Sequence, residues 1–353
     1  METIEDSGRT ARPLLSIRGL QKHFPLKGGL LGRTLAVVRA VDGVEFDVRD
    51  GETLGIVGES GCGKSTTARL LMRLMEPDAG TMLFEGRAVE ESAGGLTLRE
   101  YRRQVQMVFQ DSYASLNPRL TIEETIAFAP RVHGLSASEA IERARELLAA
   151  VGLAPENFAR RYPHELSGGQ RQRINIARAL ALRPKLVILD EPVSALDKSV
   201  EAQVLNLLLD LKAEFGLTYV FISHDLNVVQ YISDRVLVMY LGEVVEMGPV
   251  GAIYDRPGHP YTRALLDSRP SMDPAKRRTT PPLTGDPPNP VNPPSGCRFR
   301  TRCPYADAVC AERKPIMADL GDGHVVACHM ASAGSGHPLA GRLYEAPLAE
   351  MVA

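Results

Sequence analysis

The sequence has little of what a membrane-embedded or secreted protein needs. None of its apolar runs approaches the ~20 residues that a membrane-spanning helix requires. The first residues, METIEDSGRTARP, include acidic side chains and no apolar core, so they do not match a secretory signal. We therefore expect the chain in the cytosol, where thiols stay reduced and disulfides are rare.

Charge and cysteine are also scarce. The formal net charge is -2, the pI is near 6.5 and no long basic run occurs, which argues against nucleic acid as a partner. Only five cysteines are present, yet three of them fall within GCRFRTRCPYADAVC, residues 296–310. The apolar fraction of 44% is enough for a full core, and 353 residues fit about two domains.

The order of patterns along the chain predicts an α/β fold with a mostly parallel sheet. Three apolar runs predict buried strands: 52–58, 185–190 and 218–224. Residues 136–153 and 199–216 have helical periodicity, and residues 236–248 predict a hairpin around Leu241 and Gly242. Nine prolines among the 25 residues 270–294 predict a stiff linker.

The stretch GESGCGKST, residues 58–66, predicts a phosphate site. It follows a strand pattern and leads into a helix pattern, the context that G-x-x-x-x-G-K-[ST] requires. Its glycines let backbone N–H groups converge on phosphate oxygens, Lys64 adds charge for the β- and γ-phosphates, and Ser65 offers a hydroxyl to Mg²⁺. The alternative is a glycine-rich turn with a chance lysine. The predicted nucleotide-binding set is Gly58, Ser60, Gly61, Cys62, Gly63, Lys64, Ser65 and Thr66, with Cys62 serving in packing.

Two further strands deliver acid and base groups to the same sheet edge. KLVILDEP ends a strand in Asp190, which suits Mg²⁺, and Glu191 then points toward an attacking water. TYVFISHD brings His224 there, able to bind the γ-phosphate or orient the water. Acidic strand caps and a structural histidine are the alternatives.

HELSGGQRQRINIARALAL, residues 164–182, predicts a second anion-binding helix terminus. Ser167 is a good N-cap, and Gly168 and Gly169 leave backbone N–H groups uncovered. One nucleotide's phosphates are already held by the first loop. A head-to-tail dimer would use both, with each subunit's serine-glycine turn covering the other's γ-phosphate.

Taken together, these motifs resemble the nucleotide-binding domain of ABC transporters, whose signature is LSGGQ. The resemblance covers about residues 14 to 255. It implies that Gln110 contacts Mg²⁺ and water and senses a membrane subunit, that Asp197 in SALD acts across the dimer, and that Phe24 stacks on adenine. It also implies nucleotide contacts from Ser167 to Gln170, Glu191 as catalytic base and His224 as the switch histidine.

Three other segments are similar to the ATPases of bacterial oligopeptide/dipeptide permeases: PLKGGLLGRTLAVVRAVDGVEF, QDSYASLNPRLTIEETI and GHPYTRALLDSRP. This resemblance spans nearly the whole chain. It implies an ATP-hydrolysing, peripheral subunit on the cytoplasmic face of the membrane that energises peptide uptake. It further implies two permease subunits, an extracytoplasmic peptide-binding protein and a second ATPase, more often a different chain than an identical one. A soluble ABC-type ATPase outside transport, or a module with a vestigial ATPase, is the competing hypothesis.

The resemblance sets the expected fold class: a P-loop NTPase of the ABC type, with a mixed-sheet core, a helical subdomain, an antiparallel β subdomain and a small cysteine-rich C-terminal extension. The expected divisions are a disordered N-terminus 1–12, a nucleotide-binding domain 13–255 with its helical subdomain at about 111–180, an extension and proline-rich linker 256–295, an iron–sulfur-binding segment 296–332 and a tail 333–353.

The clustered cysteines have the spacing Cys297-x5-Cys303-x6-Cys310-x17-Cys328. Four thiols could bind zinc or a [4Fe–4S] cluster, and the lack of tight C-x2–4-C pairs favours iron–sulfur. The permease resemblance implies the same cluster. His324 and His329 keep zinc open as an alternative, and four reduced, ligand-free cysteines are another. Arg298, Arg300 and Arg302 would offset a cluster's charge or form a solvated basic face.

Overall fold

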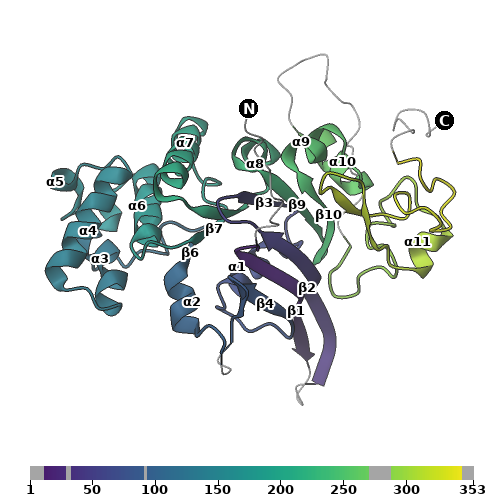
Figure 1. The fold of residues 1–353 in the computed structure, drawn as a ribbon, viewed down its shortest axis with the longest axis horizontal. Coiled ribbons are helices and arrows are strands. Elements are labelled where there is room, and N and C mark those ends of the chain that lie inside the picture. Colours follow the sequence, from purple (N-terminus) through teal and green to yellow (C-terminus); the bar gives the residue numbers. More distant parts are fainter. Residues whose placement is uncertain (1–11, 29–32, 91–93, 270–287, 344–353) are drawn as a thin grey trace, which may run out of the picture.

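The computed structural model describes residues 12–28, 33–90, 94–269 and 288–343. Most of the predicted N-terminal segment, most of the proline-rich linker and the end of the tail lie outside these residues. The described chain forms two β-sheets, a lobe of helices at one end and a small extension at the other (Figure 1). None of its helices is long and apolar enough to cross a membrane.

The larger sheet has eight strands in the order β11-β12-β10-β9-β3-β8-β7-β6. The five strands from β9 to β6 are parallel, and the other three are antiparallel. The predicted α/β class with a mostly parallel core is thereby confirmed. The strand bounds are β3 Thr53–Val57, β6 Val105–Val108, β7 Leu186–Asp190, β8 Thr218–Ile222, β9 Arg235–Tyr240, β10 Glu243–Pro249, β11 Met317–Asp319 and β12 Val325–Ala327.

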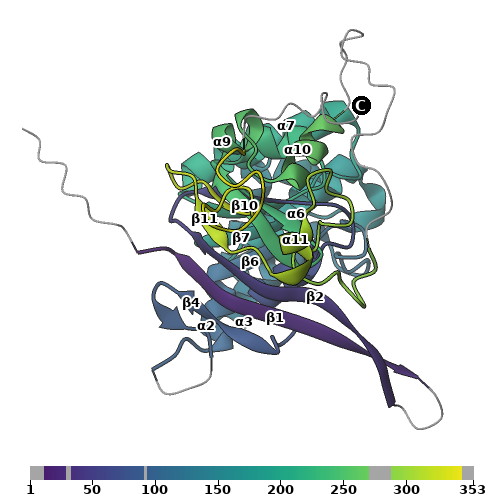
Figure 2. The same ribbon diagram turned by 90° about the vertical axis from the view of Figure 1, so that its right-hand side faces the viewer.

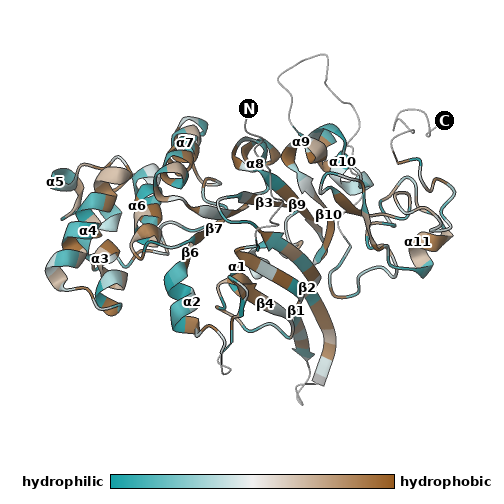
Figure 3. Cartoon of the chain, in the orientation of Figure 1, coloured by the Kyte–Doolittle hydropathy of each residue, from teal (hydrophilic) through white to brown (hydrophobic). Residues whose placement is uncertain are grey.

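The central strands are apolar along their whole length because both faces of the sheet are covered. All five residues of β3, β7 and β8 are buried, which is why the sequence shows continuous apolar runs there. On β7, Val187 and Leu189 pack with one cluster and Leu186 and Ile188 with the other. Figure 3 shows the apolar colour concentrated on this sheet and the polar colour on outward helices such as α2 (Leu98–Gln104).

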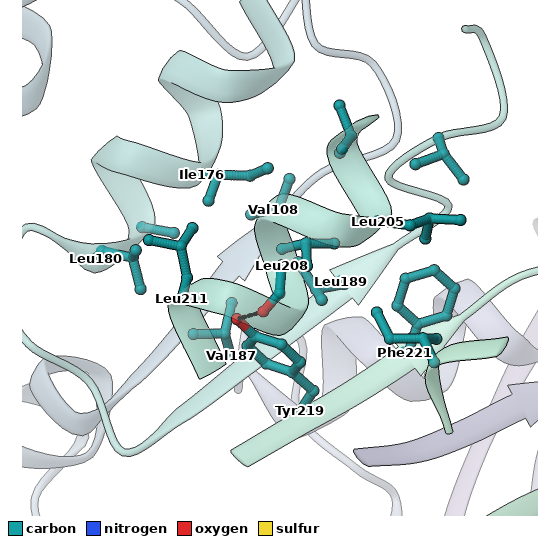
Figure 4. Close-up of a cluster of buried hydrophobic side chains, with 14 of the residues drawn as sticks. Val108, Ile176, Leu180, Val187, Leu189, Leu205, Leu208, Leu211, Tyr219 and Phe221 are labelled. Atoms are coloured by element: carbon teal, nitrogen blue, oxygen red, sulfur yellow. Dashed lines mark hydrogen bonds between the residues drawn. The ribbon is translucent and has the colours of Figure 1, made fainter. Parts of the chain in front are cut away.

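One of the two clusters joins the sheet to α6 (Gly168–Leu180) and α7 (Lys198–Phe215) (Figure 4). Within it the Tyr219 hydroxyl donates to the Leu208 carbonyl oxygen over 2.9 Å, which satisfies its polar group inside the core. The other cluster joins the opposite face of the sheet to α1 (Lys64–Leu71), α2 and the smaller sheet.

The smaller sheet is antiparallel, in the order β2-β1-β4-β5. Its long members are β1 (Leu15–Gly28) and β2 (Arg33–Val48), which Figure 2 shows as a twisted ribbon running beyond the body of the protein. The short members are β4 (Ala79–Phe84) and β5 (Arg87–Ala88).

The helical lobe contains α3 (Ile122–Val132), α4 (Ala137–Ala150), α5 (Pro155–Phe158) and the 3-10 turn η1 (Pro163–Glu165), and it packs on α6. Thr121, Ser136 and Ser167 each begin a helix with a capping box, so three helix starts are fixed by local sequence. The predicted helices at 136–153 and 199–216 are α4 and α7, and α7 ends at Gly216 with φ 63°.

The predicted hairpin is β9 and β10, with Leu241 and Gly242 at its turn. Three short helices flank this hairpin in the sequence: α8 (Leu226–Ile232) before it, and α9 (Val250–Asp255) and α10 (Pro260–Asp267) after it.

The C-terminal extension, residues 288–343, adds α11 (Ala308–Glu312) and continues the larger sheet through β12, which pairs with β10. The buried carboxylate of Glu246 on β10 accepts from the backbone N–H of His259 and lies 2.7 Å from Nε2 of His324, so the extension is joined to the sheet by a buried side-chain contact as well as by strands.

Candidate functional site

The turn between β3 and α1 is held closely by its neighbours. Gly58 and Gly63 have φ of 151° and 108°, which L side chains rarely adopt. A Cβ on Gly58 would lie 2.2 Å from the Met239 carbonyl oxygen, and one on Gly63 would lie 2.2 Å from that of Ala40. The strands β9 and β2 therefore require glycine at both positions. A Cβ on Gly61 would meet nothing within 4 Å, so this part of the loop faces open space.

Backbone hydrogen bonds join the loop to the hairpin turn and to β2. The Gly242 N–H donates to the Cys62 carbonyl oxygen and the Asp42 N–H donates to the Gly242 carbonyl oxygen, both over 2.8 Å. The Cys62 thiol is buried, and burial raises its pKa, which makes it a poor nucleophile. These contacts suit the packing role expected of Cys62.

The amine of Lys64 is folded onto its own loop. Its Nζ donates to the carbonyl oxygens of Gly58 over 2.6 Å and of Glu59 over 3.1 Å, and the residue is 6% exposed. A buried ammonium whose partners are carbonyl dipoles and the neutral Cys62 thiol gains strongly from an anion nearby. Lys64 is therefore placed to exchange these carbonyl contacts for phosphate oxygens.

Asp190 and Ser65 meet at the mouth of the turn. The Ser65 hydroxyl donates to Oδ1 of Asp190 over 3.1 Å. Burial raises the pKa of the Asp190 carboxyl and the adjacent Glu191 raises it further, against the effect of the Ser65 bond. A buried carboxylate beside a second one favours a cation, and a carboxylate with a hydroxyl is an oxygen set that Mg²⁺ accepts. Mg²⁺ usually takes only one or two protein groups and completes its shell with phosphate and water, so these residues fit it.

Glu191 is the centre of a second polar group. Its carboxylate accepts from Nε2 of Gln110 over 2.9 Å and lies 3.2 Å from Nδ1 of His224. Glu191 has φ 48°, an uncommon conformation for a non-glycine residue that is often found at functional sites. The ends of β6, β7 and β8 thus bring three residues from distant parts of the sequence together, as the sequence predicted for parallel strands.

The two groups share one cleft of about 500 Å³. Its lining includes residues of the phosphate loop, Gln110, Glu191 and His224, together with three apolar residues. The lining residues are Val38, Ala40, Ser60, Gly61, Gly63, Lys64, Ser65, Thr66, Gln110, Glu191, His224 and Pro290.

Other predicted nucleotide contacts lie outside this cleft. Ser167 caps α6 by exchanging hydrogen bonds with Gln170 and is exposed, as is Asp197 at the start of α7. A Cβ on Gly169 would lie 2.5 Å from Val200, because α6 packs closely on α7 there. Gly168 follows Ser167 at the same helix start. None of these residues lines the cleft, so one chain does not bring the signature turn to its own phosphate loop.

Phe24 lies on β1 directly opposite Val38 on β2. Its side chain is 37% exposed rather than buried in the core, and Nζ of Lys22 lies 5.8 Å from the ring centroid. Opposed residues of an antiparallel pair project on the same face, so Phe24 shares its face with the cleft-lining Val38.

The four C-terminal cysteines are free thiols on the extension. Burial raises the pKa of Cys303 to about 12 and of Cys297 to about 11, and neighbouring thiols add to both shifts. Nε2 of His324 is paired with Glu246, and Nε2 of His329 contacts the Arg313 carbonyl oxygen. Throughout the described residues, no group of three or more His, Cys, Asp or Glu side chains is placed to hold a metal ion.

The arginines of this segment were expected to be solvated or to offset a cluster, and for two of them this is wrong. The Arg302 side chain is 5% exposed and contacts both carboxylate oxygens of Glu59, over 2.7 and 3.0 Å. The Arg298 side chain is 7% exposed and pairs with Asp42 and with Glu243. Their guanidinium groups are paired instead with carboxylates of the phosphate loop, β2 and β10.

Sequence reasoning missed Glu59, Arg302 and Pro290 as parts of the site. Glu59 and Arg302 are 243 positions apart, so no local pattern links them. The Glu59 N–H also donates to the Tyr261 hydroxyl over 2.8 Å, and Tyr261 packs with Tyr240 and Phe299. The back of the phosphate loop is thus covered by the extension.

Comparison with known proteins agrees with this arrangement. Residues 41–194 match the family described as ABC transporter, and residues 245–310 match the one described as oligopeptide/dipeptide transporter, C-terminal region. The chain is 53% identical to the "Probable peptide ABC transporter ATP-binding protein y4tS" of Sinorhizobium fredii, covering 92% of each chain. It is 51% identical to the "Oligopeptide transport ATP-binding protein AppF" of Bacillus subtilis, covering 90% of this chain and 98% of that one.

Two solved structures share the fold. One is cbiO1 of Clostridium perfringens, part of the ABC transporter complex cbiONQ, with TM-score 0.59, 27% identity and coverage of 69% of this chain and 91% of that one. The other is the ATP-binding cassette MJ0796, a dimer in a post-hydrolysis state bound to ADP and phosphate. Its TM-score is 0.58 and its identity 30%, and the match covers 67% of this chain and 98% of that one.

The Arg302–Glu59 pair generates a prediction about stability. Replacing Arg302 with Gln leaves the Glu59 carboxylate partly buried and unpaired, so the free energy of unfolding should fall by about 3 kcal/mol. Arg300→Gln is the matched control, because Arg300 bonds only to Ser295 in the described contacts. This variant should change the free energy of unfolding by less than about 1 kcal/mol. Equilibrium denaturation measures both. Equal effects of the two variants would contradict the structural role of the pair, and Glu59→Gln added to Arg302→Gln should recover most of the loss.

Proposed function

The chain belongs to the ATP-binding proteins of peptide ABC transporters, and from that membership we propose that it energises the uptake of oligopeptides or dipeptides. The chain is the ATP-hydrolysing subunit of such a transporter. The observation that carries the proposal is the single cleft in which the phosphate loop faces Glu191, His224 and Gln110. A binding module with a vestigial ATPase would not need this hydrolytic group.

In the proposed reaction, phosphates enter over Gly61 and Gly63 and draw the Lys64 ammonium from the carbonyl oxygens of Gly58 and Glu59. Ser65 and Asp190 would hold Mg²⁺, which would supply positive charge against the phosphates. Glu191 accepts a proton from the water that attacks the γ-phosphorus. His224 orients that water or donates to the γ-phosphate, and Gln110 positions Glu191 through the hydrogen bond between them.

A second ATPase subunit completes the site in this proposal. Ser167, Gly168, Gly169, Gln170 and Asp197 lie outside the cleft of their own chain, although a helix N-terminus with two glycines suits a γ-phosphate. A head-to-tail partner would bring this turn over Lys64. Phe24 would stack on the base. We favour a different ATPase chain as the partner, as the sequence resemblance implies.

The membrane partners would dock beside Gln110. Four exposed apolar residues lie near this position in the sequence or on helix α3: Phe109 directly before Gln110, Tyr113 after it, and Phe128 and Val132 on α3. Asn175 on α6 donates to the Ser112 carbonyl oxygen over 3.0 Å, so the segment after Gln110 is joined to the helix that begins at Ser167. Two permease subunits at the cytoplasmic face, with an extracytoplasmic peptide-binding protein beyond them, could therefore act on both Gln110 and the signature turn.

Exchange of Glu191 for Gln tests the catalytic assignment. Loss of the general base should lower ATP turnover by about 10²-fold or more, while ATP binding persists and dimerisation tightens. Steady-state phosphate release and equilibrium ATP binding are the measurements, in the complex with its partners. The matched control is Glu214→Gln on the exposed end of α7, which should keep wild-type turnover. Wild-type turnover in Glu191→Gln would remove Glu191 from this role.

We also propose that Cys297, Cys303, Cys310 and Cys328 hold a [4Fe–4S] cluster. Burial raises the pKa of Cys297, Cys303 and Cys328, and hydrogen bonds from the backbone N–H groups of Phe299, Tyr305 and Met330 partly oppose this rise; each of these thiols also interacts with the charge of others in the set. N–H donors aimed at sulfur favour the thiolate that a cluster requires.

The spacing of these cysteines in the sequence favours a cluster over zinc, because structural zinc sites usually have tight C-x2–4-C pairs and this segment has none. The cluster would fix a segment whose own apolar core is small: Tyr305, Val326, Cys328, Met330 and Leu343.

Anaerobically purified protein should therefore contain about four iron and four sulfide per chain. Cys303→Ser should lose them and lower the thermal stability of the extension, whereas Cys62→Ser, which removes a thiol from the phosphate loop, should keep them. Iron and acid-labile sulfide assays with differential scanning calorimetry measure this. Iron-free wild-type protein, or unchanged iron in Cys303→Ser, would refute the cluster, and one zinc per chain would replace it.

A further inference from the structure

One wall of the ATP cleft comes from the C-terminal extension. Pro290 lines the cleft together with Val38 and Ala40 of β2, although the phosphate loop and the catalytic residues all lie between positions 58 and 224. Nothing in the motifs of the nucleotide-binding domain accounts for a residue from this segment. Its placement raises the question of which part of the nucleotide it would meet.

The backbone around Pro290 is held in a turn against β2. The Arg39 N–H donates to the Pro290 carbonyl oxygen over 3.3 Å, which joins the segment directly to the strand that carries Val38 and Ala40. The side chain of Asn289 accepts from the Val291 N–H over 2.9 Å, and its carbonyl oxygen accepts from Asn292. Asn289 therefore fixes the turn locally, and β2 fixes its position at the cleft.

Two buried arginines anchor the chain that follows. Arg298 pairs with Asp42, three residues beyond Arg39 on β2, and donates to the Leu241 carbonyl oxygen at the hairpin turn. Arg302 pairs with Glu59 behind the phosphate loop. The extension thus lines the cleft at Pro290. It also contacts β2 through Arg298 and the phosphate loop through Arg302.

The cleft is lined by both polar and apolar residues. Lys64, Ser65 and the loop glycines are placed to take phosphates, and Val38, Ala40 and Pro290 contribute no polar side chain. Phe24 shares the face of Val38 on the neighbouring strand. A purine offers flat apolar faces that stack on aromatic rings, so Phe24, Val38 and Pro290 suit the base better than the phosphates.

We propose that Pro290 forms part of the base subsite, so that the C-terminal extension covers the nucleobase of bound ATP. This inference rests on the proposed ATPase function and adds a residue that sets affinity for the base. The proline ring supplies a rigid apolar surface beside Val38 and Ala40, while the backbone carbonyl stays bonded to Arg39. The phosphates need no contact from this segment.

The test compares two ligands that differ in the base. ATP and inorganic tripolyphosphate share the triphosphate, and both bind without hydrolysis when Mg²⁺ is withheld. Pro290→Gly removes the ring and keeps the carbonyl. Pro293→Gly is the matched control, because it makes the same change in the same segment at a residue that does not line the cleft. Dissociation constants for both ligands are measured on the full chain by competition with a fluorescent ATP analogue.

The proposal predicts that Pro290→Gly weakens ATP binding about 5- to 10-fold, within the range of one lost base contact, and leaves tripolyphosphate binding within about twofold. Pro293→Gly should leave both unchanged. Equal loss of both ligands in Pro290→Gly, or ATP binding equal to that of the control, overturns the proposal. Lys64→Ala should weaken both ligands in every background. Wild-type protein that binds neither ligand would instead refute the ATP site itself, and with it this inference.

Discussion

The site depends on how closely β2 and β9 approach the phosphate loop. The carbonyl oxygens of Ala40 and Met239 lie where the side chains of residues 63 and 58 would begin. The loop backbone can therefore adopt its curled conformation only with glycine at these two positions. That curl leaves Gly61 facing open space and starts α1 at Lys64. The Leu241–Gly242 turn of the hairpin then joins Cys62 to Asp42 through two backbone hydrogen bonds. The antiparallel sheet, the hairpin and the parallel sheet consequently act as one frame around the triphosphate.

The C-terminal extension is part of the same frame. It lengthens the larger sheet through β12, pairs Arg302 with a residue of the phosphate loop and pairs Arg298 with Asp42 on β2. A change in the extension would therefore reach the nucleotide cleft through buried charge pairs, which are sensitive to the loss of either partner. In the proposed transporter, the cysteine-bearing segment could therefore affect ATP binding through these contacts, without any redox step.

Local sequence patterns predicted the central strands and the convergence of Glu191 and His224, whereas Gln110 was expected only from the family resemblance. Continuous apolar runs predicted β3, β7 and β8, and the parallel order of the strands explains why Gln110, Glu191 and His224 converge. The contacts between the extension and the ATPase core were not predictable in the same way. Glu59 and Arg302, or Arg39 and Pro290, are joined only after the sheets assemble, and an arginine among cysteines gives no sign of which carboxylate it will meet. The proposed head-to-tail position of Ser167 rests on chemistry, because one chain does not bring this helix start to its own phosphate loop.

The composition of the native complex tests most directly whether this ATPase drives a membrane transporter. The tagged chain would be purified from detergent-solubilised membranes of its own host, and the retained proteins identified and quantified by mass spectrometry. Two permease-like membrane proteins and a second ATPase should be retained with the tagged chain in stoichiometric amounts. Retention of soluble proteins alone, with no membrane subunit, would contradict the transport function and leave only the ATPase chemistry.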